Sequence, residues 1–139
     1  MPVKQVIVMR TDLNMRKGKM IAQGAHASMA HLANVVSDLY STNLSAANQG
    51  QDKQSILEVL DIDDQAFYLG NFRKVCLQIP SEDELLDILS EAKSANLKAY
   101  LITDSGLTEF NGVPTNTCLA IGPHQDEAID PITGHLKLL

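Results

Sequence analysis

The apolar positions of this chain follow two kinds of pattern, and the first predicts strands. Residues 3–10 alternate weakly and contain the apolar residues Val3, Val6, Ile7, Val8 and Met9, which predicts a mostly buried strand. Three further short apolar runs, bounded by polar or turn-forming residues, predict strands over 73–79, 98–103 and 117–122. The chain therefore carries four predicted strands.

The second pattern has helical spacing and predicts helices between these strands. Ala, Met, Leu and Val recur at intervals of three and four in a long segment after the first strand. Ser81 is a predicted N-cap, and Glu84 three residues later completes a capping box. Helices are predicted over 17–40, 56–70, 80–97 and, for a short terminal one, 124–133. The polar residues 41–55 predict a surface connection.

The predicted order is βααβαββα, an α/β fold in a single domain over residues 1–139. Strands linked by helices predict a four-stranded mixed sheet with right-handed crossovers and helices packed on both faces. In such sheets, binding sites gather at the carboxyl ends of the strands. No apolar run is long enough to span a membrane and no signal peptide is evident at the start, so we expect a cytoplasmic protein.

Charge is distributed unevenly along the chain. The formal net charge is −6, which argues against a nucleic-acid partner. Residues 1–31, however, hold five basic residues and one acid, while the remainder holds six basic and sixteen acidic residues. A basic pole on an acidic body is compatible with local binding of an anion, because charges act over about 8–10 Å in physiological salt.

Several chemistries lack their motif. The chain has no GxSxG, GxxxxGK[ST], HExxH or GxGxxG pattern. Cys76 and Cys118 lie far apart without CxxC spacing, so we expect two buried hydrophobic side chains and no disulfide or metal pair. His124 beside Asp126 and Glu127 is a weak metal signal. We therefore expect no metal and no cofactor.

Three polar residues share one face of the first predicted helix. Lys19, Gln23 and His26 follow i, i+4, i+7 spacing, nearly opposite an apolar face. That apolar face comprises Ile21, Ala25, Leu32, Val36 and Leu39. A cation, an amide and an imidazole together can bind an oxyanion, orient a substrate and move a proton. The alternative is an ordinary solvated helix face.

Asp104 ends the third predicted strand and begins a polar loop. A carboxylate at this position can serve a site at the sheet edge, but with Gly106 two residues later it can equally form a turn by bonding local amides. Thr108 and Thr117 are ordinary loop and strand residues when judged by position alone.

These polar residues lie within two longer motifs that resemble the type II peptidyl-tRNA hydrolase family. The first is VIVMRTDLNMRKGKMIAQGAHASM, similar to the family pattern R-x-D-L-x-M-x-K-G-K-x-x-A-Q-x-x-H-A. The second is LITDSGLTEFNGVPTNTCLAIGP, and the ending IDPITGHLKLL closes the resemblance. The matching positions are Arg10, Asp12, Leu13, Met15, Lys17, Gly18, Lys19, Ala22, Gln23, His26, Ala27, Asp104, Gly106, Thr108, Thr117, Ile121, Gly122 and Pro123. Only residues 32–70 match poorly.

The chain departs from the family pattern at a few positions. Arg16, Ile21 and Ser105 replace smaller residues, Leu107 stands where a basic residue is common, and the stretch from Thr108 to Thr117 is one residue longer. These departures suggest the hypothesis of a divergent, bacterial or phage-like branch.

The resemblance implies hydrolysis of the ester that joins a peptide to the terminal ribose of tRNA. Our hypothesis for the roles is that Asp104 orients or deprotonates water, with help from His26, and that Lys19 stabilises the oxyanion or the terminal phosphate. In the same hypothesis Gln23, Thr108 and Thr117 position the ester, and Arg10, Arg16 and Lys17 bind tRNA phosphates. Ester hydrolysis of this kind requires no metal.

Two alternatives remain at this point. One is a binding module for tRNA or protein that keeps the fold without turnover, and the other is a hydrolase of a different small acyl ester or amide. Related enzymes are commonly dimers, and the small residues of the first helix are a candidate contact between two copies, although core packing also explains them.

Overall fold

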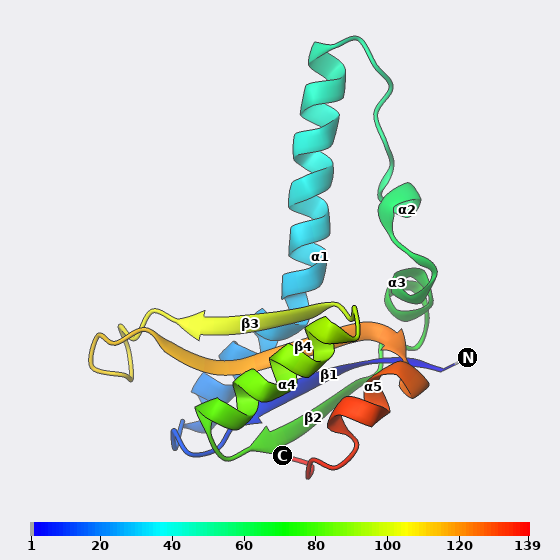
Figure 1. The fold of residues 1–139 in the computed structure, drawn as a ribbon. Helices are drawn as coiled ribbons and strands as arrows, with labels where there is room; N and C mark the ends of the chain where they lie inside the picture. Colours follow the sequence, from blue (N-terminus) through cyan, green and yellow to red (C-terminus); the bar gives the residue numbers. More distant parts are fainter. Residues whose placement is uncertain (1) are drawn as a thin grey trace.

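The computed structural model describes residues 2–139 and contains one four-stranded sheet in the order β2-β1-β4-β3 (Figure 1). The strands are β1 (Val3–Arg10), β2 (Lys74–Ile79), β3 (Ala99–Asp104) and β4 (Thr115–Gln125). β1 pairs parallel with β2 and antiparallel with β4, while β3 pairs antiparallel with β4. The predicted mixed sheet and element order are confirmed.

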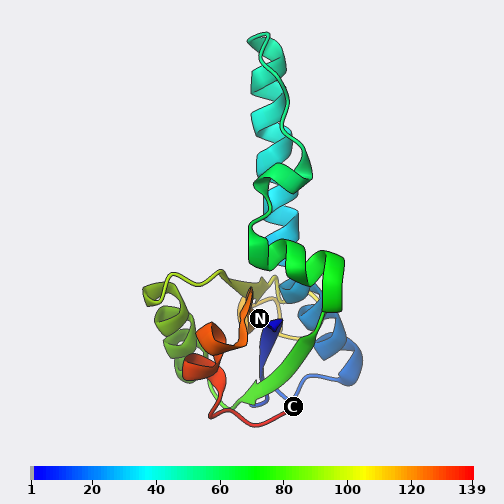
Figure 2. The ribbon, with the colours of Figure 1, turned by 90° about the vertical axis from the view of Figure 1, so that its right-hand side faces the viewer.

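Helices cover both faces of this sheet, as predicted (Figures 1 and 2). α1 lies on one face, and α4 and α5 lie on the other. The helices are α1 (Lys17–Asn48), α2 (Ile56–Val59), α3 (Ile62–Ala66), the π-helical turn η1 (Phe67–Asn71), α4 (Glu82–Ser94) and α5 (Asp126–Thr133). The Ser81 hydroxyl accepts the Glu84 N–H at 3.2 Å and so caps α4, as the sequence predicts. The predicted capping box is not completed, because the Glu84 carboxylate accepts the Ser81 hydroxyl at 2.9 Å instead of the Ser81 backbone N–H.

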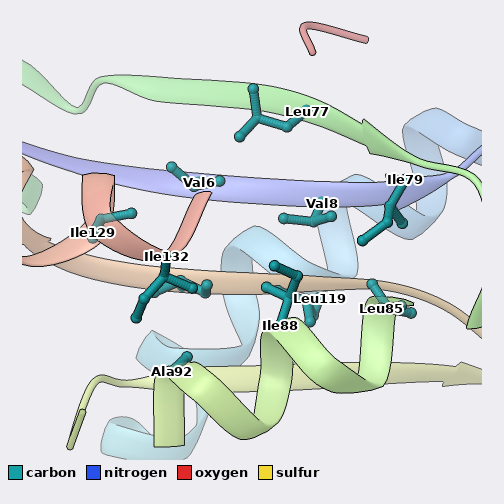
Figure 3. Packing of buried hydrophobic residues seen from close by; sticks show 11 residues of the cluster. Val6, Val8, Leu77, Ile79, Leu85, Ile88, Ala92, Leu119, Ile129 and Ile132 are labelled. Atoms are coloured by element: carbon teal, nitrogen blue, oxygen red, sulfur yellow. The ribbon is translucent and has the colours of Figure 1, made fainter. Parts of the chain in front are cut away.

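The larger hydrophobic core lies between the sheet and α4 and α5 (Figure 3). Because side chains alternate along a strand, β1 directs Val6 and Val8 into this core and Ile7 and Met9 toward α1. The core on the α1 side is smaller. Since both faces of β1 are covered, the four consecutive residues 6–9 are all apolar, which explains the sequence pattern.

The helical segments differ from the prediction in two places. α1 ends at Asn48, whereas the prediction ended it near Tyr40, and its final turns rise away from the sheet (Figure 1). Extending a helix that already exists needs no new nucleation, so the weakly patterned residues 41–48 stay helical. The predicted helix 56–70 is broken, because Leu60 is extended and the Asp61 carboxylate caps a new helix by accepting the Asp64 N–H.

The orientation of α1 differs most from expectation. Its apolar side faces outward, with Ile21 72% exposed, whereas Gln23, Ala27 and His31 are buried against the sheet. Ala27 allows close approach to the sheet, and the two polar side chains find hydrogen-bond partners there. The solvated-face alternative is therefore wrong for Lys19 and Gln23.

The two cysteines have different environments. Cys118 is buried as expected, but Cys76 is exposed, so its predicted burial is wrong. Cys76 lies on β2, in a part of the sheet that α1 does not cover. It lines an apolar groove beside that helix. No helix within residues 2–139 has both the length and the apolar character needed to cross a membrane.

Candidate active site

The candidate site forms where the N-terminal turns of α1 pass the end of β3. Asp104 is the last residue of β3, and Lys19 and Gln23 face it from successive turns of α1. The four-residue spacing of Lys19 and Gln23 places both side chains on the helix face toward the sheet. Two segments more than 80 residues apart in sequence therefore meet at one carboxylate.

Three N–H donors hold the Asp104 carboxylate. Oδ1 accepts from Lys19 Nζ at 2.8 Å and from Gln23 Nε2 at 3.3 Å, and Oδ2 accepts from the Gly106 N–H at 2.9 Å. The Lys19 hydrogen bond, followed by the Gly106 amide, lowers the pKa of Asp104 below its ordinary value. Asp104 is therefore an ionised acceptor near neutral pH.

Gly106 is the residue that allows the loop to fold back onto Asp104. Its φ is +84°, and a Cβ at this position would collide with the backbone of Val113. Only glycine fits both conditions without strain. Both sequence interpretations of Asp104 are compatible with this geometry, because Oδ2 closes a local turn while Oδ1 faces α1.

Two threonines extend the hydrogen-bond chain in opposite directions. Lys19 Nζ donates to Thr108 Oγ1 at 2.9 Å on the exposed side, and Thr117 Oγ1 donates to Gln23 Oε1 at 2.6 Å in the interior. The buried Thr117 bond fixes the Gln23 amide so that its nitrogen points to Asp104. The structure thus joins five of the six predicted catalytic residues in one network.

The sixth, His26, is placed differently. It is exposed, less than one helical turn beyond Gln23, and it makes no side-chain hydrogen bond within residues 2–139. The structure therefore does not bring the imidazole into contact with Asp104.

The three predicted phosphate-binding cations also differ from one another. Arg10 is 8% exposed and donates to Asp12 at 2.7 Å and to the Asn116 carbonyl at 2.8 Å. The Asp12 hydrogen bond raises the pKa of Arg10. Lys17 is exposed, and Arg16 is exposed with its Nε 3.4 Å from a Glu109 oxygen. Arg10 is thus committed within the protein, whereas Arg16 and Lys17 face solution.

The loop after β3 supplies contacts that sequence reasoning missed. The Phe110 ring lies beneath Lys19, with Nζ 5.7 Å from the ring centroid. Glu109 lies next to it and approaches Arg16. Neither residue follows a periodic pattern, because both belong to an irregular loop, so spacing gives no signal for them.

The network leaves unused hydrogen-bonding capacity that suits ester hydrolysis. An ammonium has three donors, and Lys19 gives two of them to Asp104 and Thr108. An ionised carboxylate has about four acceptor positions, and three are filled at Asp104. One donor remains for an oxyanion and one acceptor for a water. Among the described residues, no three His, Cys, Asp or Glu side chains gather as metal ligands.

Comparison with known proteins identifies relatives along nearly the whole chain. Residues 3–139 match the family model of peptidyl-tRNA hydrolase PTH2. The chain is 38% identical to the peptidyl-tRNA hydrolase of Methanocaldococcus jannaschii and 39% identical to that of Methanothermobacter thermautotrophicus, each over 137 residues covering 99% of this chain and 100% of the relative. It is 36% identical to the probable peptidyl-tRNA hydrolase 2 of Dictyostelium discoideum over 139 residues, which cover 97% of this chain and 54% of that protein.

Proposed function

Because the chain belongs to the peptidyl-tRNA hydrolase PTH2 family, we propose that the network around Asp104 hydrolyses the ester bond of peptidyl-tRNA, releasing peptide and free tRNA. The observation that carries this proposal is the pairing of Lys19 with Asp104 at 2.8 Å, which leaves one donor and one acceptor unused. Those two groups are what a tetrahedral oxyanion and an attacking water require.

In the proposed reaction, Asp104 accepts a hydrogen bond from water and thereby directs the water oxygen toward the ester carbonyl carbon. The new C–O bond forms as the carbonyl electron pair moves onto oxygen, and the third N–H of Lys19 stabilises that oxyanion. The intermediate then expels the ribose oxygen, which takes the proton released by the water. Because the pKa of Asp104 is lowered, its carboxylate is a weak base. Its role is therefore to orient the water, and it does not keep the proton.

The threonines and Gln23 support this arrangement. We assign contact with the ester to Thr108, because it lies on the exposed side of Lys19, while Thr117 and Gln23 hold Asp104 from the interior. We assign the exposed His26 to proton transfer with solvent. A His26→Gln variant should lower kcat by about tenfold, and an unchanged kcat would remove His26 from the reaction.

Arg16 and Lys17 are the proposed contacts to tRNA phosphates, because both are exposed at the start of α1 near the site. Arg10 supports the site in this proposal, because its guanidinium joins Asp12 to the start of β4 at Asn116. The reaction as proposed needs no metal ion and takes place in the cytoplasm.

The decisive experiment is release of N-blocked amino acid from N-blocked aminoacyl-tRNA. Lys19→Ala and Asp104→Asn should each lower kcat/KM by about 10²–10³-fold, as loss of a transition-state contact does. Asp87→Asn and Lys93→Ala are matched controls, since both residues are exposed on α4 across the sheet. Absence of turnover by the wild type, or unchanged rates in both site variants, would contradict the proposal.

Two additions to this assay test its finer parts. A chelator should leave the rate unchanged, whereas loss of activity that is restored by a metal ion would contradict the metal-free reaction. An uncharged acyl ester should be hydrolysed far more slowly than the tRNA substrate. Equal rates for both substrates would identify a general acyl-ester hydrolase instead.

We also propose that the outward face of α1 joins two copies of this chain. Its exposed large apolar side chains are Ile21, Met29, Val36, Tyr40 and Leu44. These residues span about 36 Å of helix, whereas a circular interface of about 800 Å² per partner is roughly 32 Å across. Asp38 is the only Asp, Glu, Lys or Arg in residues 20–48, so two such faces meet without like-charge repulsion.

Light scattering coupled to size exclusion tests this contact. A Val36→Glu, Tyr40→Glu variant should elute as a monomer, because it places charges in the apolar face. Ser41→Glu is the control, since Ser41 lies on a different side of the same helical turn. A monomeric wild type would overturn the proposal.

A further inference from the structure

A second polar cluster lies farther along the sheet-facing side of α1, outside the network used for hydrolysis. His31 Nδ1 is 2.9 Å from the Tyr100 hydroxyl of β3, and His31 Nε2 is 3.0 Å from Asp64 Oδ1 of α3. Lys98 Nζ donates to the same Asp64 oxygen at 2.8 Å. The side chains of His31 and Asp64 are only 8% and 4% exposed. The cluster therefore joins three separate elements in the interior.

The direction of each hydrogen bond follows from the charge on Asp64. Its hydrogen bonds from His31 and Lys98 outweigh the effect of burial and lower its pKa to about 2. An ionised carboxylate only accepts, so His31 Nε2 must donate to Asp64. In the neutral imidazole, Nδ1 is then the acceptor of the Tyr100 O–H. Each polar atom of His31 thus has a single defined partner.

This cluster and the hydrolytic network connect the same two elements. Lys19, Gln23, Ala27 and His31 follow one another at four-residue intervals along the side of α1 that faces the sheet, and Tyr100 and Asp104 are four residues apart on β3. Eight residues of helix from Gln23 to His31 span about 12 Å, and four residues of strand span about 13 Å. The spacing on the helix therefore matches the spacing on the strand.

Two attachment points restrain a helix more completely than one. Between the two points, the Ser28 hydroxyl of α1 donates to Gln5 Oε1 of β1 at 2.8 Å. Along β3 itself, within residues 2–139, Lys19 and Gln23 hydrogen-bond α1 only to Asp104, and Ala27 offers only a methyl group. The His31 contact with Tyr100 supplies a second hydrogen-bonded point on β3. A displacement of about 1 Å at reacting groups is enough to lower a rate substantially.

We propose that His31 is a positioning residue: through Tyr100 it fixes α1 along β3 and thereby holds Lys19 and Gln23 over Asp104. This inference rests on the proposed hydrolytic function. Asp64 and Lys98 hold the imidazole in the required orientation.

Tyr100→Phe is the first test, because it removes only the hydroxyl that His31 binds. We expect kcat on N-blocked aminoacyl-tRNA to fall by about tenfold while KM changes by less than about twofold. Tyr68→Phe is the matched control. Its hydroxyl is buried beside the same imidazole but has no hydrogen-bond partner within residues 2–139, so its loss should leave kcat unchanged.

Two substitutions of His31 separate positioning from stability. An Asn side chain places its polar atoms near Nδ1 and can keep the Tyr100 bond, whereas a Gln side chain reaches the Nε2 position and keeps the Asp64 bond. We expect His31→Asn to retain most of kcat even with a lowered Tm, and His31→Gln to lose about as much as Tyr100→Phe. A purely structural role would make kcat follow Tm in both variants, which would overturn the proposal.

A readout that does not need turnover keeps this inference separate from the proposed function. Carbon NMR of the Asp104 carboxyl should show its pKa moving toward its ordinary value in Tyr100→Phe, since Lys19 is the main cause of its lowering. Absence of wild-type turnover would defeat the proposed function. Wild-type turnover with an unchanged kcat and an unchanged Asp104 pKa in Tyr100→Phe would defeat this inference alone.

Discussion

The two carboxylates beneath α1 have almost identical hydrogen bonds but different surroundings. Asp104 and Asp64 each accept a lysine Nζ at 2.8 Å and a second side-chain nitrogen at one oxygen, and a backbone N–H at the other. The side chain of Asp104 is 13% exposed and that of Asp64 is 4% exposed. Each lysine also reaches an exposed partner, Thr108 for Lys19 and Asp61 for Lys98, so the difference between the two pairs lies in the carboxylates. The same bonds therefore serve chemistry at one end of the helix and rigidity at the other.

Replacing the enclosed carboxylate should have the largest effect on stability. We expect Asp64→Asn to lower the free energy of unfolding by about 3 kcal/mol, because it removes one partner of a buried ion pair. Asp104→Asn should lower it by less than about 1 kcal/mol, since its pair is more accessible to water. Urea denaturation measures both values. Equal losses would show that enclosure does not distinguish the two carboxylates.

Lowering the pH should also reveal the contribution of Asp64 to stability, with a smaller effect than substitution of this residue. The pKa of Asp64 falls from 3.8 to about 2 in the folded protein, so its contribution to stability is complete above about pH 4 and is lost as the pH falls through about 2. The shift corresponds to about 2 kcal/mol. This is less than the effect of substitution, because a protonated carboxyl keeps its place and part of its bonding. The free energy of unfolding, measured between pH 5 and pH 2, should therefore fall less steeply with decreasing pH in Asp64→Asn than in the wild type.

The sequence predicts the polar contacts at the exposed N-terminal end of α1 but not the buried contacts farther along the helix. Lys19, Gln23 and Asp104 lie at helical spacing and at a strand end, within motifs that resemble a known family. His31 and Asp64 carry no such signal. They lie 33 residues apart, Asp64 is in the poorly matched segment, and their contact depends on a helix break at Leu60.

The inverted face of α1 has a related cause. Amphipathic patterning assigns the apolar side of a helix to the core, but here Gln23 and His31 face inward. Their burial is tolerated because Thr117 and Tyr100, both more than 60 residues away, complete their hydrogen bonds. Hydrogen-bond partners so far apart in sequence are brought together only by the fold. The strands and α4, in contrast, can be predicted from the local apolar pattern and from N-capping.

Removing the buried Thr117 hydroxyl, which belongs to the network around Asp104, should have an intermediate effect on stability. Thr117→Val leaves Gln23 Oε1 without its donor, which costs about 1–2 kcal/mol in unfolding free energy. It also frees the Gln23 amide to turn away from Asp104, so kcat should fall by about tenfold. Thr117→Ser keeps the hydroxyl and should restore kcat. A Thr117→Val enzyme with wild-type kcat would show that Lys19 and the Gly106 N–H hold Asp104 without Gln23.

The smallest expected effects concern the cations beside the site. Arg16→Ala and Lys17→Ala should each lower the salt dependence of tRNA binding by about one phosphate contact, which is about a threefold change in affinity between 50 and 200 mM salt. Arg10→Ala should instead destabilise the fold, because its guanidinium is buried and its loss leaves the Asn116 carbonyl unpaired. Lys93→Ala on α4 is the control for charge alone. If Arg10→Ala changed the salt slope as much as Lys17→Ala while the unfolding free energy stayed constant, burial would not separate structural from substrate-binding cations in this protein.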